Sequence, residues 1–133
     1  MFDAINIPYG AKMLFNVVKL KSGVSFDDIE LTIGEMCNAV KNTCGNEERG
    51  FIAGQVFKCS GFISEEGSLN SGQHTEGEQE DHVAIVTYWN SFEQHEHSHA
   101  DETFNEKFSA LAEFCEDTYE IGYDMLWQGT PED

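Results

Sequence analysis

The sequence is short of positive charge and of long apolar runs, and each shortage excludes a class of protein. Lysine and arginine together number 7, against 25 aspartates and glutamates, which gives a formal net charge of -18. Nucleic-acid binding relies on clustered basic side chains that contact phosphates, so a general nucleic-acid binder is excluded. No apolar stretch reaches the roughly 18 residues that a membrane-spanning helix needs, so we expect no contact with a membrane.

Cysteine is present but lacks the spacing of a redox or zinc motif. No CxxC pair occurs among the four cysteines, which are Cys37, Cys44, Cys59 and Cys115. The amino terminus also lacks the basic start and apolar core of a signal peptide. Thiols in a chain that is not exported are expected to be reduced, so the sequence predicts a cytoplasmic protein without disulfides.

The apolar content is sufficient for one folded domain. Of the 133 residues, 40% are hydrophobic and 12% are aromatic, which suits a single core at this length. We expect one domain over 1–133 with its core at 13–127, a long acidic loop at 61–81 and a loose tail at 128–133. The acidic residues are best explained as a solvated surface, because they form no Dx[DN]x[DN]G calcium loop.

Hydrophobic periodicity predicts four strands and two helices. Alternating or continuous apolar runs indicate strands, and apolar residues three and four apart indicate helices. The expected strands are 13–21, 51–59, 82–89 and 118–127, and the expected helices are 25–42 and 91–116. The order β-α-β-β-α-β is that of a ferredoxin-like α+β fold with a four-stranded antiparallel sheet.

Two helices on one face of such a sheet leave the other face bare. The strands at 13–21 and 82–89 are apolar on both faces, so the second face should also be covered. A second copy that packs sheet to sheet would cover it. We therefore expect a homodimer with a cavity between the two sheets that admits a small apolar ligand.

A cluster of histidines follows the strand at 82–89. His95, His97 and His99 lie within five residues, and His95 and His99 are spaced i, i+4, which places both imidazoles on one side of a helix. Metal binding, a metal-free role in the cavity and no role at all remain open. In an unbroken helix His97 would continue the buried stripe, but Ser98 with Asp101 three residues later resembles a cap that would break the helix.

The residues around this cluster resemble those of the dimeric α/β-barrel superfamily. The strand ends in the aromatic pair Tyr88-Trp89, which is followed by Ser91-x-Glu93 and by the helix with paired histidines. This superfamily includes the antibiotic-biosynthesis monooxygenases. The resemblance implies a ferredoxin-like dimer and an oxygenase-like activity in its cavity.

A more detailed resemblance is to the sulfur oxygenase reductase family, whose iron is held by two helix histidines and a downstream glutamate. The HxxxH at His95 and His99 matches that motif. The glutamate would correspond to Glu116, shortly before a Tyr-Glu-Ile strand, and the active cysteine to Cys37. The resemblance therefore implies non-haem iron bound by His95, His99 and Glu116. Such a set leaves positions open for oxygen and substrate, although zinc would also accept it.

The remaining candidates would line the cavity. Trp89 ends a strand, while Asn90 could donate to a ligand or cap the following helix. Tyr119, Tyr123 and Trp127 share one face of the last strand, where they could form a ligand platform or simply pack. Cys37 falls on the buried stripe of the first helix, so a core thiol competes with the nucleophile that the resemblance implies.

Two classes of function follow. The first is a small-molecule oxygenase-like protein that acts on an apolar substrate in the cavity, with or without iron. The second is a non-catalytic protein that binds a fatty-acid-like or aromatic ligand in the same place. The paired histidines favour the first class.

Overall fold

The computed structural model describes residues 2–61, 66 and 82–132. Within them the elements follow in the order β1 (Lys12–Leu20), α1 (Phe26–Cys44), β2 (Phe51–Lys58), β3 (His82–Trp89), α2 (Phe92–Ser98), α3 (Glu102–Ala112) and β4 (Cys115–Asp124). The loop predicted at 61–81 lies outside the described residues, apart from Gly61 and Glu66.

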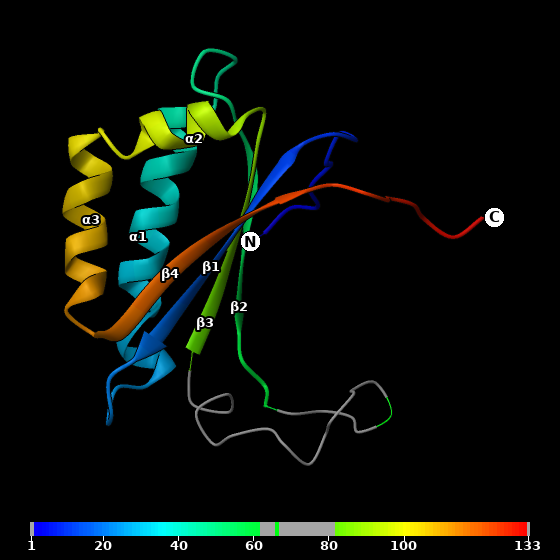
Figure 1. Ribbon diagram of the computed structural model, residues 1–133. Helices are drawn as coiled ribbons and strands as arrows, with labels where there is room; N and C mark the ends of the chain where they lie inside the picture. The colour runs from blue at the N-terminus through cyan, green and yellow to red at the C-terminus, as the bar shows by residue number, and fades with distance from the viewer. Residues whose placement is uncertain (1, 62–65, 67–81, 133) are drawn as a thin grey trace.

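The four strands form one antiparallel sheet in the order β2-β3-β1-β4. Figure 1 shows α1 and α3 side by side on one face of this sheet, while none of the described helices lies over the other face. The predicted ferredoxin-like α+β fold is therefore confirmed. None of the described helices is long and apolar enough to cross a membrane.

The main core lies between the sheet and the two long helices. Ile29 and Ile33 of α1 and Leu111 of α3 pack against Val18 and Ile85 of the two central strands. Every third or fourth residue of α1 is buried in this layer, as the sequence periodicity predicted. The helix begins at a reciprocal capping box, in which Ser25 and Asp28 each accept a backbone hydrogen bond from the other.

The helix expected at 91–116 is two helices, α2 and α3, which meet at an angle (Figure 1). The break occurs because Asp101 caps α3, where its Oδ1 accepts the backbone N–H of Phe104 at 2.8 Å. The break that Ser98 and Asp101 indicated in the sequence is therefore present. The expectation of a single helix over 91–116 is wrong.

The last strand is displaced from its predicted range. It begins at Cys115 and ends at Asp124, because Asp124 pairs with Lys12, the first residue of the neighbouring strand β1. Beyond that point the chain has no β1 residue to pair with. Trp127 consequently lies outside the sheet and is 80% exposed.

Register determines which strand residues share a face. Leu14, Val18 and Val83 lie on the face under the helices, which we call the covered face. Residues of the opposite parity form what we call the open face, and they include Met13, Phe15, Val17, Ala84, Val86, Tyr88, Tyr119, Ile121 and Tyr123.

Candidate active site

The short helix α2 places one histidine in the interior. Ser91 caps the helix by accepting the backbone N–H of Gln94 at 3.1 Å, which starts the helix immediately after β3. His95, one turn later, is buried, and its ring meets the indole of Trp89 edge to face at a centroid distance of 5.3 Å. The strand end and the helix therefore hold this imidazole from two sides.

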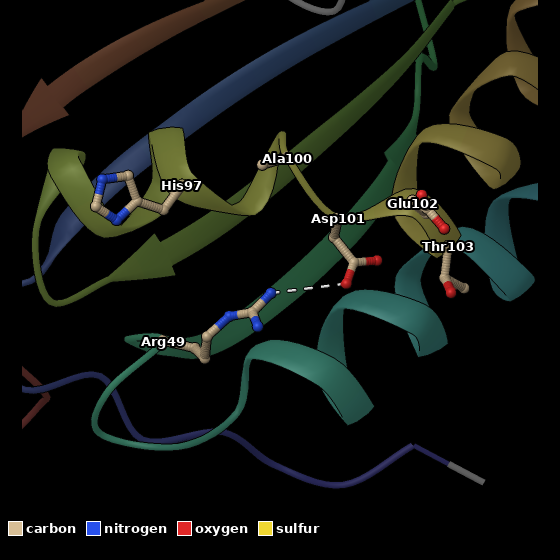
Figure 2. Close-up of a pocket in the computed structure, with 6 residues that line it drawn as sticks. All are labelled: Arg49, His97, Ala100, Asp101, Glu102 and Thr103. Carbon is tan, nitrogen blue, oxygen red and sulfur yellow. Dashed lines mark ion pairs between the residues drawn. The ribbon is translucent and has the colours of Figure 1, made fainter.

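The second histidine lies where α2 ends. His99 is the C-cap of α2, and its ring centroid is 4.5 Å from that of His95. The same ring stacks on Phe104 of α3 at 5.8 Å and an interplanar angle of 12°. His97 is exposed, and it lies in a separate, open pocket together with Arg49 and Asp101 (Figure 2). His95 is thus buried, His99 is 42% exposed but directs its ring toward His95 and Phe104, and His97 lies outside.

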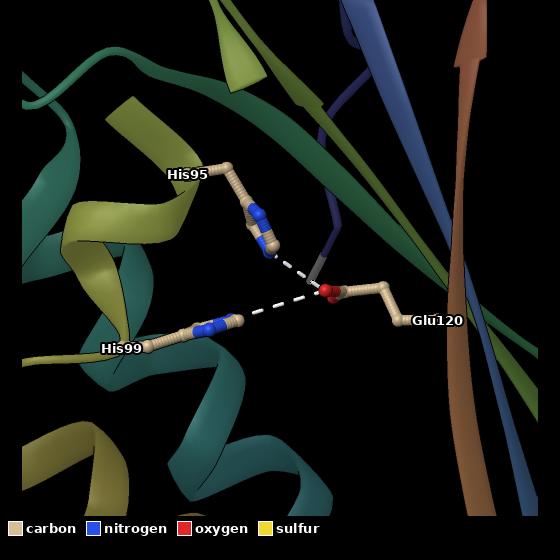
Figure 3. Close-up of side chains that lie close together, drawn as sticks. All are labelled: His95, His99 and Glu120. Carbon is tan, nitrogen blue, oxygen red and sulfur yellow. Dashed lines mark hydrogen bonds and ion pairs between the residues drawn. The ribbon is translucent and has the colours of Figure 1, made fainter. Parts of the chain in front are cut away.

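A carboxylate from the opposite layer completes the cluster. The Nε2 atom of His95 lies 3.0 Å from Oε2 of Glu120, and Nε2 of His99 lies 3.9 Å from Oε1 of the same side chain. Figure 3 shows both imidazoles directed at this carboxylate, which extends from β4. One potential ligand atom from each of the three residues lies within 4.8 Å of the other two. The arrangement can hold one metal ion or operate as a His–Glu hydrogen-bonded pair.

The carboxylate at the histidines is Glu120 and not Glu116, the residue that the sequence resemblance implied. Glu120 pairs with Asn16 of β1 and shares the covered face. Glu116 is exposed and falls at an irregularity in the β1–β4 register, between the pairs Lys19–Asp117 and Leu20–Cys115. Period-two alternation places Glu120 on the face opposite to Tyr119 and Ile121, but only the register with Asn16 brings it to the histidines.

The cluster borders an open, mainly apolar cavity of about 1650 Å³, which extends beyond the helical layer to residues 2–5 and to Val17 and Tyr119 of the open face. Between the helices and the sheet its lining includes Trp89 of β3, Phe104 and Phe108 of α3, and Met36 of α1. The cavity that the sequence predicted between the sheets of a dimer is therefore not where this site lies. The site lies beneath the helices of a single chain, because its ligands come from α2 and from the covered face of β4.

Cys37 also lines this cavity, on the buried stripe of α1. Burial raises the pKa of its thiol above the ordinary value. The protonated form is therefore favoured at neutral pH, and a protonated thiol is a poor nucleophile. These surroundings favour the core role that the sequence also allowed for Cys37.

The other ligand-binding candidates are dispersed. Trp89 contacts His95, as described, but Tyr119 and Tyr123 lie on the open face, where Tyr123 meets Phe15 edge to face at 6.4 Å. Asn90 is exposed, and the capping role open to it is taken by Ser91. Of the predicted site residues, the structure therefore clusters His95, His99 and Trp89, while Cys37 and Tyr119 line the same cavity.

Comparison with known proteins identifies the fold. No protein-family model matches the chain, and no curated protein matches its sequence. A solved structure from Arabidopsis thaliana is 18% identical, with a TM-score of 0.60 over 90% of this chain and 99% of that one. Hydroxynitrile lyase from Passiflora edulis is 10% identical, with a TM-score of 0.61 over 92% and 100%.

SnoaB, a cofactor-independent oxygenase from Streptomyces nogalater, is 12% identical, with a TM-score of 0.59 over 92% of this chain and 99% of that one. Further similar structures are dimeric ferredoxin-like proteins of unknown function and antibiotic biosynthesis monooxygenases. Because function varies widely within one fold, these similarities establish architecture alone. The chain has the fold of the dimeric ferredoxin-like proteins, a group that includes antibiotic biosynthesis monooxygenases, as its residues around Trp89 suggested.

Proposed function

We propose that this protein is an oxygenase that acts on a small apolar substrate, with a single ferrous ion held by His95, His99 and Glu120. One observation supports the proposal above all others: two imidazoles and one carboxylate, from separate layers of the fold, converge on one point at the wall of an apolar cavity. Fold alone would not justify it, because proteins of this architecture include both a lyase and oxygenases.

The donor set fits a ferrous ion. Two imidazole nitrogens and one carboxylate oxygen match the ligand type of non-haem iron oxygenases, in which the bound ion supplies open positions for oxygen and substrate. The side chain of Glu120 is only 29% exposed, so its charge is partly desolvated and is available to neutralise a cation. Trp89 and Phe104 pack against the two rings and fix their orientation.

The apolar lining supports an apolar substrate. A cavity with walls of Met36, Trp89, Phe104 and Phe108 gains free energy by excluding water around an apolar molecule. The His–Glu cluster would then be the polar group that such a molecule meets. We accordingly assign an apolar substrate without naming its identity.

A second candidate is a metal-free protein that binds an apolar ligand without turnover. The observation that favours it is the direct contact of 3.0 Å between His95 Nε2 and Glu120 Oε2, a distance at which the pair forms a hydrogen bond without any ion. In this case the same cavity shelters a fatty-acid-like or aromatic ligand, and the imidazole orients it.

The open face supports a homodimer. It presents Tyr119, Ile121 and Tyr123, each between 44% and 45% exposed in the single chain, beside the apolar side chains of β1. A sheet face with this composition is typical of an interface. The similar structures that are dimeric agree with a second copy as its occupant.

The metal content of the full-length protein tests the proposal. After anaerobic incubation with ferrous ion and desalting, mass spectrometry should find about one iron per chain. The double variant His95→Ala/His99→Ala and the single variant Glu120→Ala should lose it. His97→Ala and Glu116→Ala are the matched controls, since each removes the same kind of side chain a short distance away, and both should retain the iron.

Two outcomes would decide against iron. If the wild-type protein binds none, the ferrous site is wrong and the metal-free binding protein becomes the better account. If the site variants retain as much iron as the controls do, the bound metal lies elsewhere on the acidic surface.

A further inference from the structure

The turn between α1 and β2 contacts both ends of the segment that contains the two histidines. We infer that Arg49 and Gln94, neither of which belongs to the metal-ligand set, are positioning residues that fix the direction of His95 and His99. The inference deepens the proposed function and rests on it for its catalytic meaning. Its structural part concerns side-chain geometry alone.

Gln94 attaches the start of α2 to this turn. Its amide Nε2 donates to the backbone carbonyls of Glu47 and Glu48 at 3.0 and 3.1 Å. Gly50 has a φ of +81°, and a Cβ there would lie 2.4 Å from the Gln94 side chain. The backbone N–H of Asn90 donates to the Gly50 carbonyl at 2.9 Å. The residue directly before His95 is thus hydrogen-bonded into a turn that only glycine allows to approach so closely.

Arg49 attaches the other end of the segment. This residue is the single arginine of the chain. Figure 2 shows its ion pair with Asp101. Nη2 lies 3.7 Å from Oδ2 of Asp101 and 3.8 Å from the buried thiol sulfur of Cys44. The Asp101 side chain is 17% exposed, so solvent screens this ion pair less than a surface pair.

The ion pair extends to the site through the cap of α3. Oδ1 of Asp101 accepts the backbone N–H of Phe104, and the Phe104 ring stacks on His99. Loss of the Arg49 contact should loosen the cap, displace Phe104 and release the imidazole that it supports. The contacts at Gln94 and Arg49 therefore act on His95 and His99 respectively, from outside the cavity.

Cobaltous ion, whose visible absorption reports ligand geometry, is the probe for this inference. Full-length wild type, Gln94→Ala and Arg49→Ala are each titrated with it. Each variant should raise the dissociation constant about tenfold, the lower end of what loss of an outer contact costs a metal site. Lys107→Ala is the matched control, because it removes a cation from the 3.2 Å ion pair with Glu35 between α1 and α3 and should leave the constant unchanged.

A second measurement needs no metal. In the metal-free protein, nuclear Overhauser effects between the rings of His99 and Phe104 should be strong in the wild type and in Lys107→Ala, and weak in Arg49→Ala. Asp101→Asn is a milder variant, because asparagine retains the capping acceptor and removes only the charge that Arg49 meets. It should weaken the same signal if Arg49→Ala does not fold.

The outcomes separate this inference from the function on which it rests. Unchanged ring contacts and unchanged cobalt binding in Gln94→Ala and in either Arg49→Ala or Asp101→Asn would overturn the positioning role. A wild-type protein that binds no cobalt would instead contradict the proposed metal site. In that case the nuclear Overhauser effects between His99 and Phe104 alone test whether Arg49 fixes the orientation of the His99 ring.

Discussion

The two faces of the sheet differ less in polarity than is usual for a sheet with helices on one side, because polar residues lie within the apolar core of the covered face and exposed apolar residues lie on the open face. The covered face contains Asn16, Thr87 and Glu120 among its apolar residues, and all three reach the cavity. The open face, over which no described helix lies, presents Ile121 and Tyr123 to solvent, although Val17 and Val86 on the same face are buried within the single chain. In most sheets of this kind the packed face is apolar and the solvent face is polar.

The polar residues on the covered face and the apolar residues on the open face indicate different roles for the two faces. Polar side chains beneath a helical layer cost free energy unless they have a partner or a ligand, so their presence indicates a site rather than a plain core. An apolar face in a chain of net charge -18 indicates a surface that is covered in the working protein. The core and the candidate site therefore share the covered face, while the open face is the surface that we propose for association.

Replacing a matched pair of isoleucines gives the largest expected contrast between the faces. Ile85, on the covered face, is 6% exposed, whereas Ile121 on the open face is 44% exposed. Ile85→Ala should lower the free energy of unfolding of the monomer by about 2–5 kcal/mol. Ile121→Ala should lower it by about 0.5 kcal/mol or less, since little of its surface leaves water within one chain. Urea denaturation at low protein concentration measures both, and equal losses would contradict the distinction.

A charge on the open face should act on association instead. Ile121→Lys places an ammonium in the proposed interface and should raise the dimer dissociation constant about a hundredfold. Analytical ultracentrifugation over a range of concentrations measures this constant. Leu31→Lys is the control, since Leu31 of α1 is 74% exposed and lies away from the sheet. If both variants, or neither, dissociate the dimer, the open face is not the interface.

The smallest expected effect concerns the cavity thiol. Burial raises the pKa of Cys37 in the folded protein above 9.0, its ordinary value. The folded state therefore retains a proton that the unfolded chain releases, so this contribution to stability is complete below pH 9.0 and is lost at higher pH. Cys37→Ser should flatten the loss of stability above that pH. Cys115, whose pKa burial also raises, should preserve part of the slope.

The fold was predictable because its signals are local. The strand at 82–89 was predicted with its observed bounds, and the apolar stripe through Ile29, Ile33 and Met36 identified the buried side of α1. Alternation along 118–127 revealed a strand but not its end, because the end depends on where β1 begins. Strand ends set by a partner far away in the sequence have no local signal.

The site was predictable only in part for the same reason. His95 and His99 were identifiable by their spacing, and Ser98 with Asp101 marked the break that turns them inward. The third ligand position depends on which β4 residue lies opposite Asn16, a property of the sheet register. Similarly, the contact between Arg49 and Asp101 joins residues more than fifty positions apart, and no spacing rule connects them.

The contact between His95 and Glu120 has a mechanical consequence. β4 is an edge strand, bonded through its backbone to β1 alone, and edge strands are the first parts of a sheet to open. A buried imidazole from α2 holds this strand at its midpoint by a side chain. A ligand that strengthens this contact should therefore stabilise β4 against local opening. Amide protons of β4 would then exchange more slowly when the site is filled. Their exchange rate would therefore show whether the site is occupied.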